Sequence, residues 1–136
     1  MKFQETDFTE ELRGQIKNTE CTLKDYIDSV LSEYKSVFAS KSLDFDAGFD
    51  KEGNDPFMPG YRSTISIGIA EKNEELIGLH TIRIWECERF FGGMPVSKKI
   101  PGSKVIGELL DESFEEIKEE LNEYINEFFA DGIGSP

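Results

Sequence analysis

The sequence predicts an α+β fold: an antiparallel sheet of about three to four strands with N-terminal and C-terminal helices packed on one face. Three observations lead to this prediction, namely an apolar helical stripe near each end of the chain and a long β-hairpin between them. A chain of 136 residues fits the size of one domain, residues 1–136, whose core needs no disulfide or metal to hold it.

The predicted hairpin opens with isoleucine at every second position, Ile65, Ile67 and Ile69, which is the period of a strand with one buried face. A polar connector at 71–75 leads into a second strand at 76–91, rich in β-branched and aromatic residues.

This second strand has a mixed pattern. Ile82 and Ile84 fall on one face, and strict alternation places four other residues on the opposite face: Leu79, Arg83, Trp85 and Cys87. Both faces are therefore expected to be partly covered, as in a central strand.

A long helical pattern precedes the hairpin. Thr9 or Thr6 is placed to cap a helix that starts near Glu10, because a threonine hydroxyl accepts a hydrogen bond from an unpaired backbone N–H. Apolar residues recur every three or four positions through residues 9–38, as one helix or as two that meet at 18–20.

Two shorter segments connect this helix to the hairpin. Residues 43–49 alternate apolar with acidic or small residues, which predicts a short edge strand. Residues 50–60 concentrate glycine, proline, asparagine and aspartate and are expected to form a loop.

The C-terminal helix has the clearest start signal. Ser113 followed by Glu116 is a capping box, which satisfies two backbone donors reciprocally. We expect a helix over 113–129, with five apolar residues packed on the isoleucine face of the hairpin: Phe114, Ile117, Leu121, Ile125 and Phe128. Residues 131–136 are expected to fray.

Composition excludes several classes of partner. A net charge of −13 disfavours binding to a phosphate backbone or to anionic lipid, so neither nucleic acid nor a membrane is expected as a ligand. Cys21 and Cys87 are too few for a disulfide framework, which favours reduced thiols in a cytoplasmic protein. No apolar run approaches the length of a membrane span.

Known catalytic and metal-binding patterns are missing. His80 is the single histidine, and its potential partner Cys87 is expected on the opposite face of the strand. The carboxylates at 44–55 lack the spacing of an EF-hand, and Gly102-Ser103-Lys104 lacks the upstream glycine of a P-loop. We therefore predict no catalytic residue, no metal site and no cofactor.

Charge is unevenly distributed along the chain. Residues 89–107 carry four positive side chains and no acidic one, within a chain of net charge −13, so the remainder carries −17. Apolar side chains in this stretch either tuck under the loop or form an exposed patch. The stretch is the alternative candidate binding loop, with Arg89, Phe90, Phe91, Met94, Lys98 and Lys99.

The main candidate site is the acidic face of the C-terminal helix. Helical spacing places five glutamates away from the apolar stripe: Glu116, Glu119, Glu120, Glu123 and Glu127. The helix has six glutamates and one lysine, more than solubility requires, so we expect this face to contact a basic protein.

These features favour a small acidic protein-interaction module that masks a basic partner surface, as an immunity protein, an antitoxin or a phage-type inhibitor does. A non-enzymatic function is favoured. Two alternatives stay open: a ligand-binding or enzymatic domain acting on a small anionic substrate through residues 44–55 or 89–104, and an assembly protein of a phage-like particle.

Overall fold

The computed structural model describes residues 1–73 and 75–130. Within them the chain forms a six-stranded antiparallel sheet in the order β1-β6-β4-β3-β2, with β5 paired to β4. The elements are β1 (Lys2–Gln4), the 3₁₀ turn η1 (Glu5–Asp7), α1 (Glu10–Ala39), β2 (Leu43–Glu52), β3 (Tyr61–Glu71), β4 (Leu76–Phe91), β5 (Met94–Pro95), β6 (Lys104–Leu109) and α2 (Phe114–Ala130).

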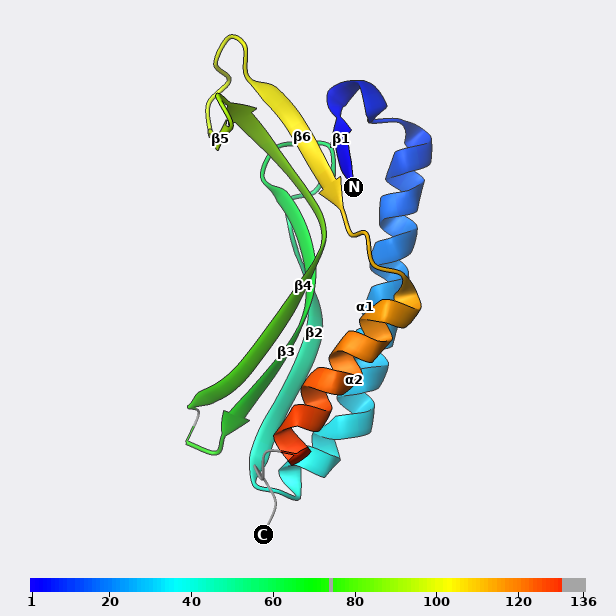
Figure 1. The fold of residues 1–136 in the computed structure, drawn as a ribbon, viewed down its shortest axis with the longest axis vertical. Coiled ribbons are helices and arrows are strands. Elements are labelled where there is room, and N and C mark those ends of the chain that lie inside the picture. Colours follow the sequence, from blue (N-terminus) through cyan, green and yellow to red (C-terminus); the bar gives the residue numbers. More distant parts are fainter. Residues whose placement is uncertain (74, 131–136) are drawn as a thin grey trace.

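The α+β class, the antiparallel sheet and the two helices are confirmed, and Figure 1 shows α1 and α2 on the same face of the sheet. The predicted number of strands is wrong, because the six strands of the described residues exceed three to four. β1 and β5 are too short to give a periodic signal. In β6 the buried row consists of Val105, Gly107 and Leu109, so the glycine interrupts the apolar alternation in the sequence. A Cβ at Gly107 would lie 2.1 Å from Cη2 of Trp85.

The N-terminal pattern forms one helix, α1, which runs through residues 18–20 without a break. Thr9 is its N-cap, and the Thr9 hydroxyl accepts a hydrogen bond from the Leu12 N–H at 3.2 Å. The edge strand β2 is longer than the predicted 43–49, because its pairing with β3 continues to Glu52 opposite Arg62.

Two β-bulges decide which side chains of β4 face the helices. Ser63 pairs with Trp85 and Thr64 with Arg83, so Ile84 is an extra residue and the alternation shifts after it. A second register shift lies at Ile77. The predicted faces are therefore wrong for part of β4: Trp85 and Cys87 are fully buried on the same side as Ile82 and Ile84.

The helix-facing side of the sheet carries two apolar cores. The larger one joins the C-terminal half of α1, α2 and the lower parts of β2, β3 and β4. It contains the predicted stripe residues Ile117, Leu121, Ile125 and Phe128 together with the three isoleucines of β3. The smaller one gathers Leu12, Ile16, Tyr61, Trp85, Cys87, Val105 and Leu109 under the N-terminal segment.

The capping box of α2 is confirmed by two hydrogen bonds. The Glu116 N–H donates to Ser113 Oγ at 3.2 Å, and the Ser113 N–H donates to Glu116 Oε1 at 3.0 Å. Phe114, which was predicted to lie in the apolar stripe, is 38% exposed and contacts the Tyr26 ring edge-on. Residues 131–136, predicted to fray, lie outside the described residues.

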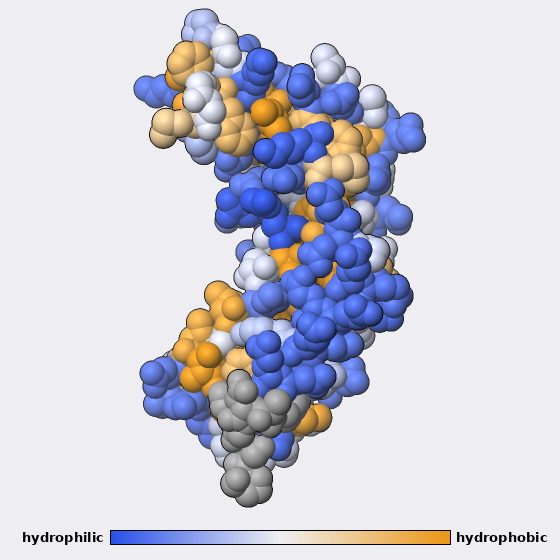
Figure 2. All heavy atoms as spheres, in the orientation of Figure 1, coloured by the Kyte–Doolittle hydropathy of each residue, from blue (hydrophilic) through white to orange (hydrophobic). Residues whose placement is uncertain are grey.

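The sheet is long and bends away from the helices, so its outer face is concave (Figure 1). Figure 2 shows the resulting hollow on one side of the molecule. None of the helices in the described ranges is long and apolar enough to cross a bilayer.

Candidate functional site

The lower half of β4 is a free sheet edge. β3 pairs with β4 on one side, whereas β6 reaches only Trp85 to Phe90 on the other. The Ile84 carbonyl accepts a hydrogen bond from the Leu110 N–H, and beyond that point no described strand covers β4. The segment from Leu76 to Arg83 is therefore open on one side.

The pairing pattern identifies the backbone groups that point out of this edge. The Cys87 carbonyl points toward β3, because it accepts from the Gly60 N–H at 2.8 Å. In an antiparallel ladder the direction alternates from residue to residue, and the bulge at Ile84 shifts that alternation by one. The N–H and C=O groups of Leu79, Thr81 and Arg83 consequently point away from β3, and all three residues are exposed.

A hollow of about 270 Å³ lies beside this edge, between β4, the end of β6 and α2. Carboxylates dominate its charged lining: Glu108, Asp111, Glu112 and Glu120 face a single cation, Arg83. Arg83 already donates to Glu86 and, at 3.4 Å, to Glu108. The hollow is thus a concave, acidic pocket bordered by unpaired backbone groups.

His80 anchors α2 to this part of β4. Its Nε2 lies 2.6 Å from Glu120 Oε2, and its ring lies 4.8 Å from that of Tyr124. The His80 contact lowers the pKa of Glu120. A shared hydrogen bond with Glu120, burial, and the charges of Glu120 and Glu116 raise the pKa of Glu112. The neighbouring carboxyl groups therefore disfavour one another's ionised form, and a further cation in the hollow would reduce this repulsion.

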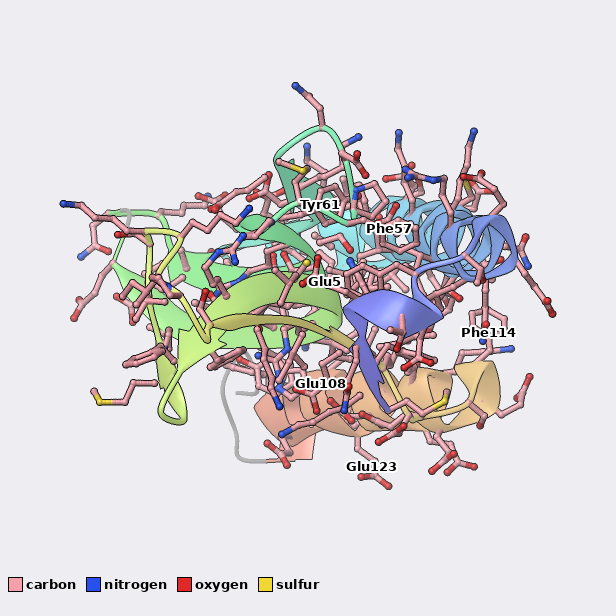
Figure 3. All side chains as sticks on the ribbon, turned by 90° about the horizontal axis from the view of Figure 1, so that it is seen from above. Glu5, Phe57, Tyr61, Glu108, Phe114 and Glu123 are labelled. Atoms are coloured by element: carbon pink, nitrogen blue, oxygen red, sulfur yellow. The ribbon has the colours of Figure 1, made fainter. Side chains whose placement is uncertain are left out.

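The five predicted partner-binding glutamates have different surroundings. Glu116 serves in the capping box and Glu120 bonds His80. Glu119, Glu123 and Glu127 are exposed. Figure 3 shows Glu123 extending from α2 away from the sheet and from α1. The helix face is acidic as predicted, and Glu120 links it directly to the free edge of β4.

The opposite edge of the sheet, formed by β2, is built differently. The outward N–H of Ala47 donates to Asp46 Oδ1 and that of Lys51 donates to Asp50 Oδ1, both at 3.0 Å. The aspartates of β2 therefore occupy backbone donors that a further strand would need. Most of the acidic segment 44–55 therefore lies along strand β2 and not in a loop.

A second pocket, of about 570 Å³, occupies the upper part of the concave face. Burial opposes ionisation of Glu86, but a 2.7 Å hydrogen bond from Arg62 and the charge of Arg83 outweigh it and lower the Glu86 pKa. Burial and the charge of Glu86 raise the pKa of Glu88. Phe90 also lines this pocket.

The alternative binding loop is divided by the structure. Arg89 donates to Ser103 Oγ at 3.2 Å, and Phe90 faces the concave pocket. Phe91 and Met94 are 45% and 69% exposed at the β4–β5 turn, so they form a patch rather than a tucked cluster. Lys98 and Lys99 are exposed on the following loop.

The remaining candidates are not brought together. His80 and Cys87 share the helix-facing side, contrary to the prediction, but seven residues of strand separate them by roughly 20 Å. Burial raises the pKa of the Cys87 thiol to about 12, whereas Cys21 is exposed on α1. Among residues 1–73 and 75–130, no three His, Cys, Asp or Glu side chains group as metal ligands.

Sequence reasoning missed the free edge and the hollow. The extent of β6 decides where β4 is left unpaired, and this extent has no local signature. A partial signal was available, since Leu76 and Leu79 are apolar on the outer face of the sheet and are 58% and 60% exposed. Figure 2 shows apolar surface at this end of the sheet, next to the hydrophilic surface of α2.

No family model, curated protein or solved structure matches this chain.

Proposed function

We propose that this protein is an interaction module that binds and masks a basic surface of another protein, in the manner of an immunity protein, an antitoxin or an inhibitor. One observation carries the proposal: an acid-lined hollow lies where the acidic helix α2 meets the free edge of β4. A concave site with unpaired backbone groups and mostly negative charge is suited to a protein ligand.

The charge of this region supports a basic partner. From residue 111 to residue 130 the chain has eight carboxylates and one lysine, a net charge of −7 within a chain of net charge −13. Acidic residues spread over the whole surface would suffice for solubility. Three of the eight, Asp111, Glu112 and Glu120, line the hollow and the other five lie on the adjoining helix α2. Their concentration in one segment gives a directional field, which accelerates association with a basic partner.

The test is an affinity capture from the native host followed by mass spectrometry. Wild-type protein is compared with a triple variant, Glu119→Lys, Glu123→Lys and Glu127→Lys, which changes exposed residues with no structural hydrogen bond in the described part of the chain. We expect wild type to capture a basic protein stoichiometrically and the variant to lose it. The association rate should fall about tenfold or more between low and physiological salt.

Two controls accompany this experiment. The variant Asp25→Lys, Asp28→Lys and Glu33→Lys makes the same charge change on exposed positions of α1 and should keep the partner. Reversal of Lys98 and Lys99 to glutamate should also leave binding intact. If the lysine reversals abolish capture while the α2 variant retains it, the binding surface is the 89–104 loop and our assignment is wrong.

A second candidate function rests on the concave pocket. The neighbouring carboxyls of Glu86 and Glu88 have pKa values shifted in opposite directions, which is a feature of ligand and acid–base sites. Three cations, Lys2, Arg83 and Lys104, line the pocket together with three carboxylates, Glu86, Glu88 and Glu108, so a small ligand that carries both an anionic and a cationic group fits its charge. Calorimetric titration with small dicarboxylates and amino acids tests this candidate, and Phe90→Ala should weaken any binding found.

A further inference from the structure

We infer that the partner binds by strand addition: an extended segment in which basic and apolar residues alternate pairs with β4 along Leu79, Thr81 and Arg83. The inference rests on the proposed function and specifies its binding mode. It also identifies the part of the partner that enters the acidic hollow.

The backbone of β4 offers unpaired hydrogen-bonding groups to a further strand. Leu79, Thr81 and Arg83 direct their N–H and C=O groups out of the sheet on the side where no described strand pairs. In contrast to β2, no aspartate side chain of β4 bonds the outward N–H groups, because the segment from Leu76 to Arg83 contains no aspartate or glutamate. An incoming strand therefore finds donors and acceptors at the spacing of a β-ladder.

The side chains around the edge define the sequence of that strand. Its residues on the helix-facing side would lie beside His80 and Ile82, within reach of Glu112 and Glu120 in the hollow. Its residues on the outer face would lie beside Leu79, which is 60% exposed. Successive residues of a strand face opposite sides, so the pattern that fits is basic toward the hollow and apolar on the outer face.

Charge argues against a second copy of this chain as the occupant. A symmetric pairing of two β4 edges would bring together two α2 helices, each in a segment with eight carboxylates and one lysine. Like charges facing each other across an interface cost affinity, whereas a lysine or arginine beside Glu112 favours its ionised form. The occupant is therefore a basic segment of a different protein.

The experiment uses the full chain and a synthetic probe, a short peptide in which lysine alternates with valine. Amide hydrogen exchange is measured by NMR with and without the peptide. We expect exchange of Thr81 and Arg83 to slow by about tenfold or more, with the amides of β2 unchanged. A peptide with the same charge but N-methylated valines cannot complete the ladder and should give no protection.

Thr81→Pro is the matching change in the protein. Proline removes the outward N–H of Thr81 but no hydrogen bond to β3, and it is tolerated on a free edge. Thr81→Pro should lower the affinity for the lysine–valine peptide by about tenfold. Lys51→Pro is the control, since the Lys51 N–H points out of the opposite edge and should not affect the peptide.

Four outcomes of the peptide and stability experiments would overturn the inference, and a fifth concerns the captured partner. The N-methylated peptide binds equally well, a glutamate–valine peptide gives the same protection, wild type dimerises through β4 in sedimentation experiments, or Thr81→Pro keeps the fold and full peptide affinity. If the α2 charge variant loses the captured partner, but Thr81 and Arg83 stay unprotected in the complex of that partner with wild type, the proposed function stands and strand addition is wrong.

Discussion

The two long edges of the sheet are built on opposite principles. Along β2, Asp46 and Asp50 bond the outward N–H groups of Ala47 and Lys51. Along the lower part of β4, Leu79, Thr81 and Arg83 are exposed and their outward backbone groups have no described partner. Side chains of β2 occupy two of the outward donors of one edge, whereas the other edge is open beside an acidic hollow.

The difference concerns how each edge is protected against pairing with a further strand. An open apolar edge carries a risk of aggregation, which proteins commonly reduce with charged residues or a covering element. Two N–H groups of β2 are protected in this way, whereas the open part of β4 has no such side chain and has Glu112 and Glu120 beside it. Under the proposed strand addition, the open edge of β4 is the one that pairs with a partner.

The largest expected effect concerns the packing that holds α2 beside the open edge. Leu121 is 1% exposed in the larger core. Leu121→Ala should lower the free energy of unfolding by about 2–5 kcal/mol, through lost burial and the cavity left behind. Chemical denaturation measures this free energy, and a loss below about 0.5 kcal/mol would contradict the position of Leu121 in the core.

Two glycines allow a direct comparison of the edges. A Cβ at Gly78 on β4 would lie 2.3 Å from Phe128 Cζ and 2.6 Å from the Tyr124 hydroxyl. Gly78→Ala should therefore cost about 1–3 kcal/mol by forcing α2 away from the sheet. Gly48→Ala on β2 meets nothing within 4 Å and should be neutral in the same melts. Equal costs at both positions would contradict the close contact between α2 and β4.

The protection of β2 can be removed without loss of the fold. Asp46→Ala with Asp50→Ala frees the N–H groups of Ala47 and Lys51 at a cost of about 1 kcal/mol or less, because water replaces one exposed and one partly buried hydrogen bond. We expect this variant to self-associate in sedimentation experiments. Asp44→Ala with Glu52→Ala removes the same charge and should stay monodisperse; self-association of both variants would show that charge alone protects β2.

The smallest expected effect is the pH-dependent stability contributed by the His80–Glu120 contact beside the open edge. The His80 contact lowers the pKa of Glu120, so its stabilisation is present above the ordinary glutamate pKa of about 4.3 and is lost as pH falls through the folded-state value. Because Glu120 is 34% exposed, Glu120→Gln should cost only about 0.5 kcal/mol near neutrality. The difference from wild type should disappear in acid, whereas Glu119→Gln should show no such pH dependence.

Sequence alone predicted the features that depend on neighbours along the chain. Thr9 caps α1, Ser113 and Glu116 form the capping box of α2, and the isoleucines of β3 face the helices, as their spacing required. Local hydrogen bonds and helical or strand periodicity determine these features, so a short window of sequence contains the information.

Tertiary structure alone decided the candidate site. The extra residue Ile84 turns Trp85 and Cys87 into the core, because β3 and β6 set the register of β4 from outside its own sequence. The pairing of β6 with β4 ends at Trp85, so the outward backbone groups of Leu79, Thr81 and Arg83 have no strand beside them. Glu120, which contacts His80, lies forty residues later in the chain, on α2. Strand register and edge exposure are properties of pairing between distant segments, and the local pattern of β4 contains no record of them.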